Sequence, residues 1–310
     1  MQVHYSLIDF IKLEHAVATI GTFDGVHLGH QKILSTLIST AKLKSSPSVV
    51  ITFWPHPRQV LQPDNKSLKI LYTLPERIEL LKDLGIDHLI VIPFDIAFSK
   101  TSSQDFVTKI IMEIIGANTL ILGYDHRFGN NRSGSFEYLQ THADSYGLTL
   151  IEISRQDIDA VGISSSRIRE AIAKGEIEEA NRLLGHSFHL TGKVIQGDMI
   201  GRKIGFPTAN VMLGDAHKTI PPDGVYAVWV THADIQYKGM MNIGYRPTVN
   251  GAIHRLEVHI LDFNLDIYDQ EIKITFKEKL RDERKFEGLA LLMEQLQKDK
   301  LATISVLSHS

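Results

Sequence analysis

Two histidines three residues apart, His27 and His30, are the side chains of this sequence best suited to chemistry on an anion. An apolar run at 16–20 precedes them, and apolar residues recur at helical spacing from 33 to 41, which predicts a strand, a turn and a helix. The first turn of a helix offers free backbone N–H groups and the positive end of the helix dipole, so a phosphate is favoured there. Three glycines let the backbone of this turn approach a ligand closely: Gly21, Gly25 and Gly29.

A pair of histidines at this spacing is also half of a metal site. A zinc site needs further Cys, His or acidic ligands at recognisable spacing, and the sequence has no cysteine and no second ligand pair of that kind. Both histidines follow a predicted parallel strand, at the end where open α/β sheets bind ligands. The anion site is therefore the favoured interpretation.

The composition is that of a globular protein with room for two cores. The chain has 310 residues, of which 43% are hydrophobic and 22% charged. Its net charge of −3 gives no reason to expect a nucleic-acid partner. No apolar run reaches the ~20 residues that cross a bilayer, and the first residues lack the layout of a signal peptide. With no cysteine, a reducing compartment fits, so we expect a cytoplasmic protein without a membrane partner.

The first part of the chain, residues 1–184, alternates strand-like and helix-like segments. Buried strands are predicted after the opening one at 49–53, 88–92, 119–122 and 148–153. Two of the helices between them are predicted at 75–84 and 102–115, each followed by a glycine. Such alternation is typical of an α/β fold with a doubly wound parallel sheet, which is Rossmann-like.

The pattern changes in residues 185–310, where strands follow one another without intervening helices. They are predicted at 188–195, 224–231, 236–243, 255–262 and 271–279. Strands joined by short turns indicate an antiparallel sandwich or a small β-barrel. A helix predicted at 286–300, with apolar residues on one face, follows them.

Two more loops follow strands of the first predicted sheet. One supplies an acidic acceptor and an arginine suited to a phosphate or an aromatic ring, and the other places serines and an arginine at a helix start. Each alone is equally explained as a structural connection, since a serine is a routine helix cap. At one edge of a parallel sheet, however, all three loops would converge on one nucleotide. The candidate residues are Asp125, Arg127, Ser164, Ser165 and Arg167.

The second part of the chain holds a glycine-rich segment with two cations at 197–210. It lacks the Gly-x-x-x-x-Gly-Lys-Ser/Thr spacing of a P-loop, yet it could cradle a polyphosphate; the alternative is a mobile hairpin loop. Thr208 and Asn210 are spaced by two on a predicted strand, so their side chains point to one face. A hydroxyl and an amide oxygen side by side suit Mg²⁺.

Glu257 is a charged residue in a predicted strand, on the face that it shares with His259. An isolated strand glutamate is usually a solvated surface residue. If the sheet curls into a small barrel, the same carboxylate could face a cleft and act as a general base.

Six stretches of the chain resemble a known family, the bifunctional bacterial riboflavin kinase/FMN adenylyltransferases, or FAD synthetases. GTFDGVHLGH, GYDHRFGNNRSG and ISSSRIR are similar to the signatures of the adenylyltransferase half. GRKIGFPTANV, MNIGYRPTVNG and LEVHILDFNLDIYDQ resemble the kinase module. The resemblance runs in the expected order from about residue 16 to 286 and implies a Rossmann-like nucleotidyltransferase domain at 1–184 and a closed β-barrel at 185–310.

The resemblance implies two transferase reactions, each with ATP and Mg²⁺. The second domain would phosphorylate riboflavin to FMN, and the first would adenylylate FMN to FAD with release of pyrophosphate. In the first domain His27 and His30 would bind the triphosphate and stabilise charge at the α-phosphorus, with Arg167 as a further catalytic residue. Contacts to nucleotide or flavin are implied for Gly21, Phe23, Asp24, Gly25, Gly29, Asp125, Arg127, Ser164 and Ser165.

In the second domain the resemblance makes Glu257 the group that activates the hydroxyl of riboflavin. Thr208 and Asn210 would bind Mg²⁺ and phosphates, and Arg281 with the final helix would help to form the flavin site. The glycine-rich loop would close over the nucleotide through Gly201, Arg202, Gly205, Phe206 and Pro207.

Three alternatives stay open at this point. Only one module could be active, or the chain could be a flavin- or nucleotide-binding regulator without turnover. The intact histidine pair and the Thr208, Asn210 and Glu257 set argue against loss of either activity. A nucleic-acid-binding protein on the same fold would need a basic stripe that the sequence lacks.

Overall fold

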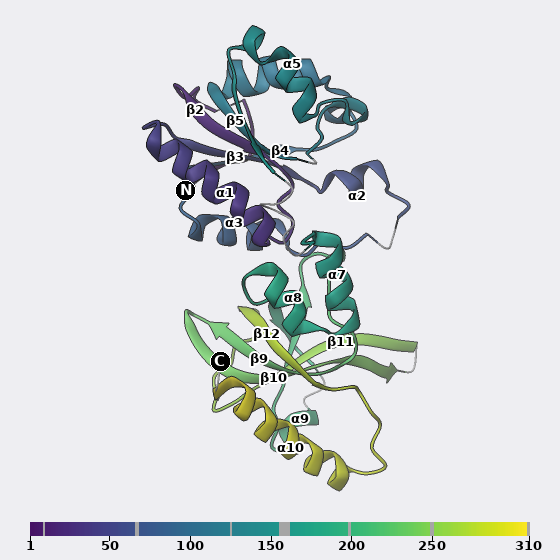
Figure 1. Cartoon of the computed structure of the whole chain (residues 1–310). Helices are drawn as coiled ribbons and strands as arrows, with labels where there is room; N and C mark the ends of the chain where they lie inside the picture. Colours follow the sequence, from purple (N-terminus) through teal and green to yellow (C-terminus); the bar gives the residue numbers. More distant parts are fainter. Residues whose placement is uncertain are drawn as a thin grey trace. The chain divides into compact units, whose positions relative to one another are not determined.

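The structure is a computed structural model that describes residues 1–8, 10–65, 68–124, 126–154, 162–197, 200–248 and 251–308 (Figure 1). The chain divides into two compact units, Met1–Ser165 and Ser166–Ser310. In the described ranges, no helix is both long and apolar enough to cross a membrane.

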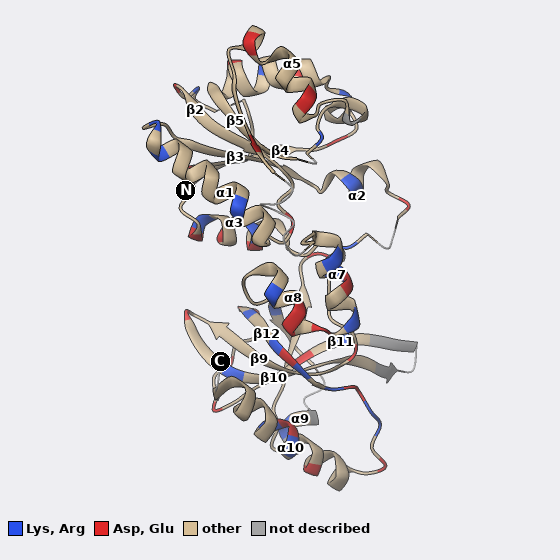
Figure 2. Cartoon of the chain, viewed as in Figure 1, with Lys and Arg blue, Asp and Glu red and all other residues tan. Residues whose placement is uncertain are grey.

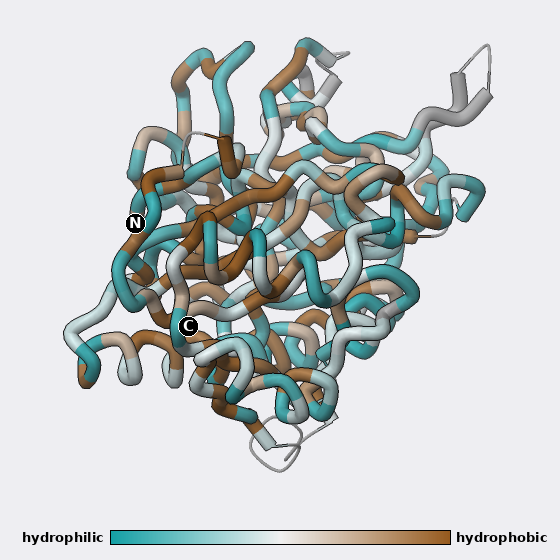
Figure 3. Tube along the Cα trace, turned by 90° about the horizontal axis from the view of Figure 1, so that it is seen from above, coloured by the Kyte–Doolittle hydropathy of each residue, from teal (hydrophilic) through white to brown (hydrophobic). Residues whose placement is uncertain are grey.

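The first unit is built on a parallel sheet with the strand order β1-β4-β3-β2-β5-β6. The four central strands are almost wholly buried, as expected for a parallel sheet covered on both faces. Figure 3 shows the hydrophobic stretches of the whole chain in brown between hydrophilic ones in teal. The strands are β1 (Gln2–His4), β2 (Ala16–Ile20), β3 (Ser48–Trp54), β4 (His88–Pro93), β5 (Ala117–Gly123) and β6 (Thr149–Ile153). The predicted doubly wound parallel sheet is confirmed.

Helices cover both faces of this sheet (Figure 1). On one face, Leu34 and Leu37 of α1 (Leu28–Leu43) pack in a buried cluster with α3 (Leu74–Asp83) and Val17 of β2. On the other face, the helices at Phe106–Ile115 (η2) and Phe136–Tyr146 (α5) pack in a cluster with Ala16 and Ala18. The remaining helical segments are α2 (Pro57–Leu61), η1 (Phe98–Lys100), α4 (Ser103–Asp105), η2 (Phe106–Ile115), η3 (Asn130–Arg132) and α5 (Phe136–Tyr146).

One predicted helix differs in its geometry. The segment expected as a single helix over 102–115 begins as one α-turn and continues as η2, a π-helix with i→i+5 hydrogen bonds. It ends where predicted, because Gly116 takes up the left-handed conformation at φ 80°.

The order of the strands creates a switch point in the sheet. From β2 the chain continues to β3 on one side, and it later returns to place β5 on the other side of β2. Ligands of open α/β sheets bind at the carboxyl ends of strands at such a point. The loops that follow β2, β5 and β6 leave three adjacent strands at that edge, as predicted.

The second unit is a closed antiparallel barrel with the order β10-β11-β8-β7-β12-β9. Its interior is apolar: Met241, Ile243 and Val258 are fully buried. This geometry decides between the predicted sandwich and barrel. The strands are β7 (His189–Ile195), β8 (Ala209–Leu213), β9 (Gly224–His232), β10 (Ile235–Thr248), β11 (Gly251–Ile260) and β12 (Glu271–Arg281).

Four helices accompany the barrel in the described part of this unit: α7 (Ser165–Lys174), α8 (Ile177–Leu184), α9 (Ile200–Lys203) and α10 (Leu289–Ser308). Lys and Arg alternate with Asp and Glu along α7 and α8 (Figure 2). The side chain of Asn181 in α8 donates to Phe276 O at 3.0 Å and accepts from Phe188 N at 2.7 Å, so α8 is bound to the barrel. The last helix, predicted at 286–300, begins three residues later and continues to Ser308, where it packs on β9, β10 and β12.

Candidate active sites

The first candidate site is the histidine turn, Gly21–His30, between β2 and α1. His27 caps α1: its Nδ1 accepts a hydrogen bond of 3.3 Å from His30 N. The two imidazole rings stack with centroids 3.6 Å apart, and Phe23 meets His30 edge-on at 5.3 Å. Both histidines therefore lie at the positive end of a helix, as the sequence predicts.

The environment of His30 favours the neutral imidazole. Its Nδ1 is buried and has no hydrogen-bond partner among the described residues. Burial lowers the pKa of His30 well below its usual 6.5, and the positive charges of His27 and Arg77 lower it further. A neutral ring can donate a hydrogen bond to a phosphate oxygen without first gaining a proton.

The backbone of the histidine turn is strained and firmly held. Phe23 and Val26 have left-handed φ values of 48° and 42°, which are uncommon for such residues. The buried carboxylate of Asp24 accepts from Leu71 N at 2.9 Å and from Tyr72 N at 3.1 Å. Phe23 and Asp24 thus support the turn from within, and their predicted contact with a nucleotide stays a prediction.

The loop after β5 forms a small hairpin rather than a loose connection. Phe128 and Gly134 exchange two backbone hydrogen bonds of 2.9 Å, and Phe128 is buried. Ser133 is linked to Ser103 at the start of α4 by a hydroxyl contact of 2.7 Å. Arg127 is exposed on this hairpin, whereas Asp125 lies outside the described residues.

The loop before α7 meets the histidine turn. Ser165 Oγ donates to Asp24 O at 2.7 Å, while Ser164 is exposed. Arg167 falls in the second unit, where its Nη2 lies 2.9 Å from Glu179 Oε1. The structure brings Ser165 to the histidine turn; the catalytic role of Arg167 stays a prediction.

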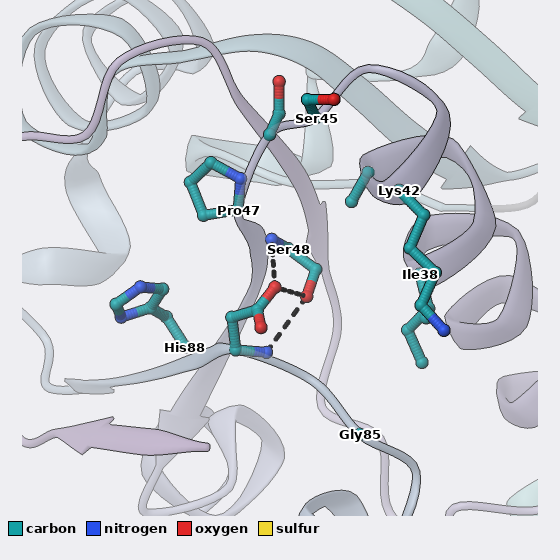
Figure 4. Close-up of a pocket in the computed structure, with 10 residues that line it drawn as sticks. Ile38, Lys42, Ser45, Pro47, Ser48, Gly85 and His88 are labelled. Carbon is teal, nitrogen blue, oxygen red and sulfur yellow. Dashed lines mark hydrogen bonds between the residues drawn. The ribbon is translucent and has the colours of Figure 1, made fainter.

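A different cavity in this unit, of about 430 Å³, lies at the amino ends of β3 and β4 (Figure 4). Its polar groups are used within the fold: Ser48 donates to Asp87 Oδ2 through N at 2.9 Å and Oγ at 2.6 Å, and Asp87 N donates to Ser48 Oγ at 3.0 Å. These bonds hold two strand ends together. Because the strands are parallel, this cavity is at the opposite end of the sheet from the histidines.

The second candidate site is the barrel cavity, a pocket of about 260 Å³ on the outer face of the barrel. Leu292 and Leu296 of α10 form one wall. Residues of the glycine-rich segment and of three strands, β10, β11 and β12, line the pocket: Gly201, Phe206, Thr208, Asn242, Glu257 and Arg281. The predicted cleft for Glu257 is therefore present.

Strand pairing places an asparagine side chain on each side of Glu257. In the register of the barrel, Glu257 of β11 lies opposite Asn242 of β10 and Asn210 of β8. Paired residues of antiparallel strands share a face, so the three polar side chains are neighbours. The Glu257 side chain is 15% exposed, and Arg255 Nη1 lies 3.8 Å from its Oε1.

Only some residues of the glycine-rich segment line this cavity. Gly201 accepts from Phe206 N at 2.9 Å, and both residues line the pocket with Thr208. Asn210 is buried beside Gly197, which leaves no room for a Cβ there, and it is not among the residues that line the pocket. Three predicted ligand contacts are instead exposed and do not line the pocket: Arg202, Gly205 and Pro207.

A buried ion pair fixes α10 over the barrel cavity. Arg281 donates from Nε to Asp299 Oδ1 at 3.0 Å and from Nη2 to Asp299 Oδ2 at 2.8 Å. Gln295 Nε2 donates to the same carboxylate at 2.7 Å, and Asp299 is 3% exposed. Arg281 therefore joins the cavity and the final helix. Its part in a flavin site stays a prediction.

Family models match both units of the chain. One described as FAD synthetase matches residues 10–167, and one described as riboflavin kinase matches residues 184–307. A curated protein of Bacillus subtilis, named bifunctional riboflavin kinase/FMN adenylyltransferase, is 39% identical over 308 residues, covering 96% of this chain and 95% of that protein. The Escherichia coli K12 protein of the same name is 37% identical over 289 residues, covering 93% and 91%. The chain belongs to the bifunctional riboflavin kinase/FMN adenylyltransferase family.

A solved structure has the same arrangement of elements. It is a Streptococcus pneumoniae protein described as a macrolide-efflux protein, with a TM-score of 0.87 and 32% identity, covering 97% of this chain and 98% of that one. Its description is a statement about that protein alone. The likeness extends over nearly the whole chain and supports the fold described above.

The sequence did not indicate two residues that the structure places beside the predicted site residues. Arg77 of α3 is 2% exposed behind the histidine turn, and Asn242 lies directly opposite Glu257 on the neighbouring strand β10. Arg77 could have been found, because it stands on the apolar face of its helix between Leu74 and Leu81. Asn242 could not, because only the long-range register brings it to Glu257.

Proposed function

We propose that this protein converts riboflavin to FMN in its second unit and FMN to FAD in its first, using ATP in both steps. One observation carries the proposal: in each unit, residues predicted from sequence gather at one place. His27, His30 and Ser165 meet at the switch point of the sheet, and Thr208 and Glu257 line one cavity.

In the kinase step, Glu257 acts as the general base. It takes the proton from the 5′-hydroxyl of riboflavin, whose oxygen bonds to the γ-phosphorus of ATP as ADP leaves. Asn242 and Asn210 flank the carboxylate and orient the reacting groups. Phe206 and Leu296 offer apolar surface to the flavin ring.

The donor set beside Glu257 suits Mg²⁺. Thr208 and Asn210 present a hydroxyl and an amide oxygen, and Mg²⁺ usually combines one or two protein oxygens with phosphates of its substrate. When bound there, the ion would neutralise charge on the transferred phosphate. Both residues are proposed as its ligands.

In the adenylylation step, the protein supplies positioning and charge stabilisation instead of a covalent nucleophile. A phosphate oxygen of FMN bonds to the α-phosphorus of ATP, and pyrophosphate leaves. His30 and His27 donate to the phosphates at the amino end of α1, where backbone N–H groups add their donors. Ser164, Ser165, Arg127, Asp125 and Arg167 are proposed to hold nucleotide or flavin around them.

The division of labour follows residues 1–184 and 185–310, in a cytoplasmic protein whose partners are riboflavin, FMN and ATP. We propose no nucleic-acid or membrane partner.

The decisive experiment is a product assay. Purified protein is incubated with riboflavin, ATP and Mg²⁺, and riboflavin, FMN and FAD are separated by chromatography. Both products are expected. Absence of both would leave a flavin-binding regulator as the remaining candidate, and FMN alone would show that only the kinase module is active.

A further inference from the structure

Arg77 of α3 is a buried cation that the two reactions described so far do not use. It is 2% exposed, and its Nη1 donates to the carbonyl of Thr22 in the histidine turn and, at 3.4 Å, to Thr52 Oγ1. Its Nε and Nη2 are buried without a hydrogen-bond partner among the described residues. The guanidinium also lies 5.5 Å from the ring centroid of Trp54.

This placement is costly for the fold. Burial lowers the pKa of Arg77 to about 10, although the nearby carboxylate of Asp24 opposes that shift. A leucine or methionine would suit the apolar face of α3 without desolvating a charge. The Trp54 ring offsets part of the cost only. A buried arginine in this position therefore calls for a reason outside the stability of α3.

The reason lies in the strained turn that Arg77 contacts. Thr22 immediately precedes Phe23, which holds a left-handed φ of 48°. The segment around the start of α3 holds this turn through two sets of hydrogen bonds. Backbone amides of Leu71 and Tyr72 donate to the Asp24 carboxylate. The Arg77 side chain donates to the Thr22 carbonyl. The turn that carries both histidines is therefore held at two points: its Asp24 carboxylate binds backbone amides, and its Thr22 carbonyl binds Arg77.

We infer that Arg77 is a positioning residue for adenylyl transfer, which fixes the histidine turn and keeps a permanent positive charge behind the histidine pair; this inference rests on the proposed function of that site. The charged groups that lower the pKa of His30 are His27 at the start of α1 and Arg77 on α3, and the carboxylate of Asp24 favours the charged form of Arg77. A fixed charge there prepares the site for the triphosphate before it binds.

The test compares Arg77→Met and Arg77→Lys in the full chain with Arg58→Met, which removes an exposed arginine of α2. FAD formation from supplied FMN is measured, and riboflavin phosphorylation by the same preparation is the internal reference. Arg77→Met is expected to lower kcat for FAD formation by about tenfold to hundredfold, because the turn loses its carbonyl anchor. Arg58→Met and riboflavin phosphorylation should be unchanged, and Arg77→Lys should recover part of kcat.

The titration of His30, followed by NMR of histidine-labelled protein, separates positioning from general damage. Removing the positive charge in Arg77→Met should raise the pKa of His30, although burial still keeps it below 6.5, whereas Arg77→Lys should leave it unchanged. An unchanged kcat in Arg77→Met, or a His30 pKa that does not move, overturns the inference. If circular dichroism shows that Arg77→Met does not fold, Arg77→Lys decides: a kcat for FAD formation below that of the wild type, with riboflavin phosphorylation unchanged, supports the inference, and an unchanged kcat overturns it. Wild-type protein that makes no FAD refutes the proposed function instead, and the NMR result still decides the placement of the charge.

Discussion

The histidine turn and the barrel cavity place their functional side chains by different means. His27 and His30 are three residues apart, and the first turn of α1 alone brings their rings to 3.6 Å. Glu257 meets Asn242 and Asn210 only because three strands pair in one register. One site therefore depends on local backbone conformation and the other on long-range strand pairing. A substitution in one site should lower one activity and leave the other unchanged.

The largest effect is expected from Glu257→Gln. Without a base, riboflavin phosphorylation should fall by about 10²- to 10⁴-fold. FAD formation from supplied FMN should be unaffected, because the histidine turn is intact. The measurement is the initial rate of each reaction, with Glu271→Gln at the exposed start of β12 as the matched control. Equal loss of both activities would show that the two sites do not work separately.

The reverse separation is expected from His30→Ala. Loss of a phosphate donor should lower FAD formation by about 10²- to 10³-fold and leave riboflavin phosphorylation unchanged. His15→Ala, in the same unit before β2, is the control. A kinase rate that fell with the adenylylation rate would contradict the assignment of His30.

A smaller effect on activity and a clear effect on stability are expected from Asp299→Asn. Removing one partner of the buried ion pair leaves Arg281 without its counter-charge, which should destabilise the second unit by about 3 kcal/mol. Because α10 forms a wall of the barrel cavity, the KM for riboflavin should rise while FAD formation from FMN is unchanged.

Urea unfolding can follow this unit alone through Trp229, in a Trp54→Phe background. Glu294→Gln, which breaks an exposed ion pair of the same helix, should leave the midpoint unchanged. If the midpoint is also unchanged in Asp299→Asn, the ion pair between Arg281 and Asp299 does not stabilise the packing of α10 on the barrel.

The smallest effect is a shared acid sensitivity. Burial lowers the pKa of His30 in the first unit and of His189 in the second well below 6.5. Below pH 6.5 the unfolded chain gains protons that the folded units do not, so stability falls as the pH falls, by at most about 1.4 kcal/mol per pH unit for each histidine. The free energy of unfolding of the second unit between pH 7 and 5 should vary less in His189→Gln than in the control, His217→Gln. Identical slopes would show that His189 does not titrate as described.

The difference between the two sites also explains what the sequence could predict. The strand, turn and cap of the histidine turn follow from residues close together in the chain, and His27 was correctly placed at the start of α1. Glu257 was identified from the sequence, but its neighbour Asn242 was not. The pairing register of β10 and β11 brings the two together, and neither strand's sequence alone determines that register. The internal use of Asp24 was missed for the same reason, since its partners stand at 71 and 72.

Element boundaries show a similar division. The left-handed glycine at 116 ended its helix as predicted, but the π-type hydrogen bonding of η2 has no marker in the pattern of apolar residues. The final helix runs to Ser308 because Thr303 and Leu307 are buried against the barrel, beyond the predicted end at 300. Packing against the barrel therefore extends this helix beyond the residue at which its apolar periodicity ends.

The two hydrogen bonds of Asn181 carry a consequence for how such a chain can be divided or fused. A gene fragment that begins at residue 185 encodes every barrel strand but lacks the amide that serves Phe276 O and Phe188 N. Those two backbone groups would then need water or a new partner. A fragment that begins at Ser166 carries its own partner for both, so recombination between modules preserves these two bonds when the junction precedes α8.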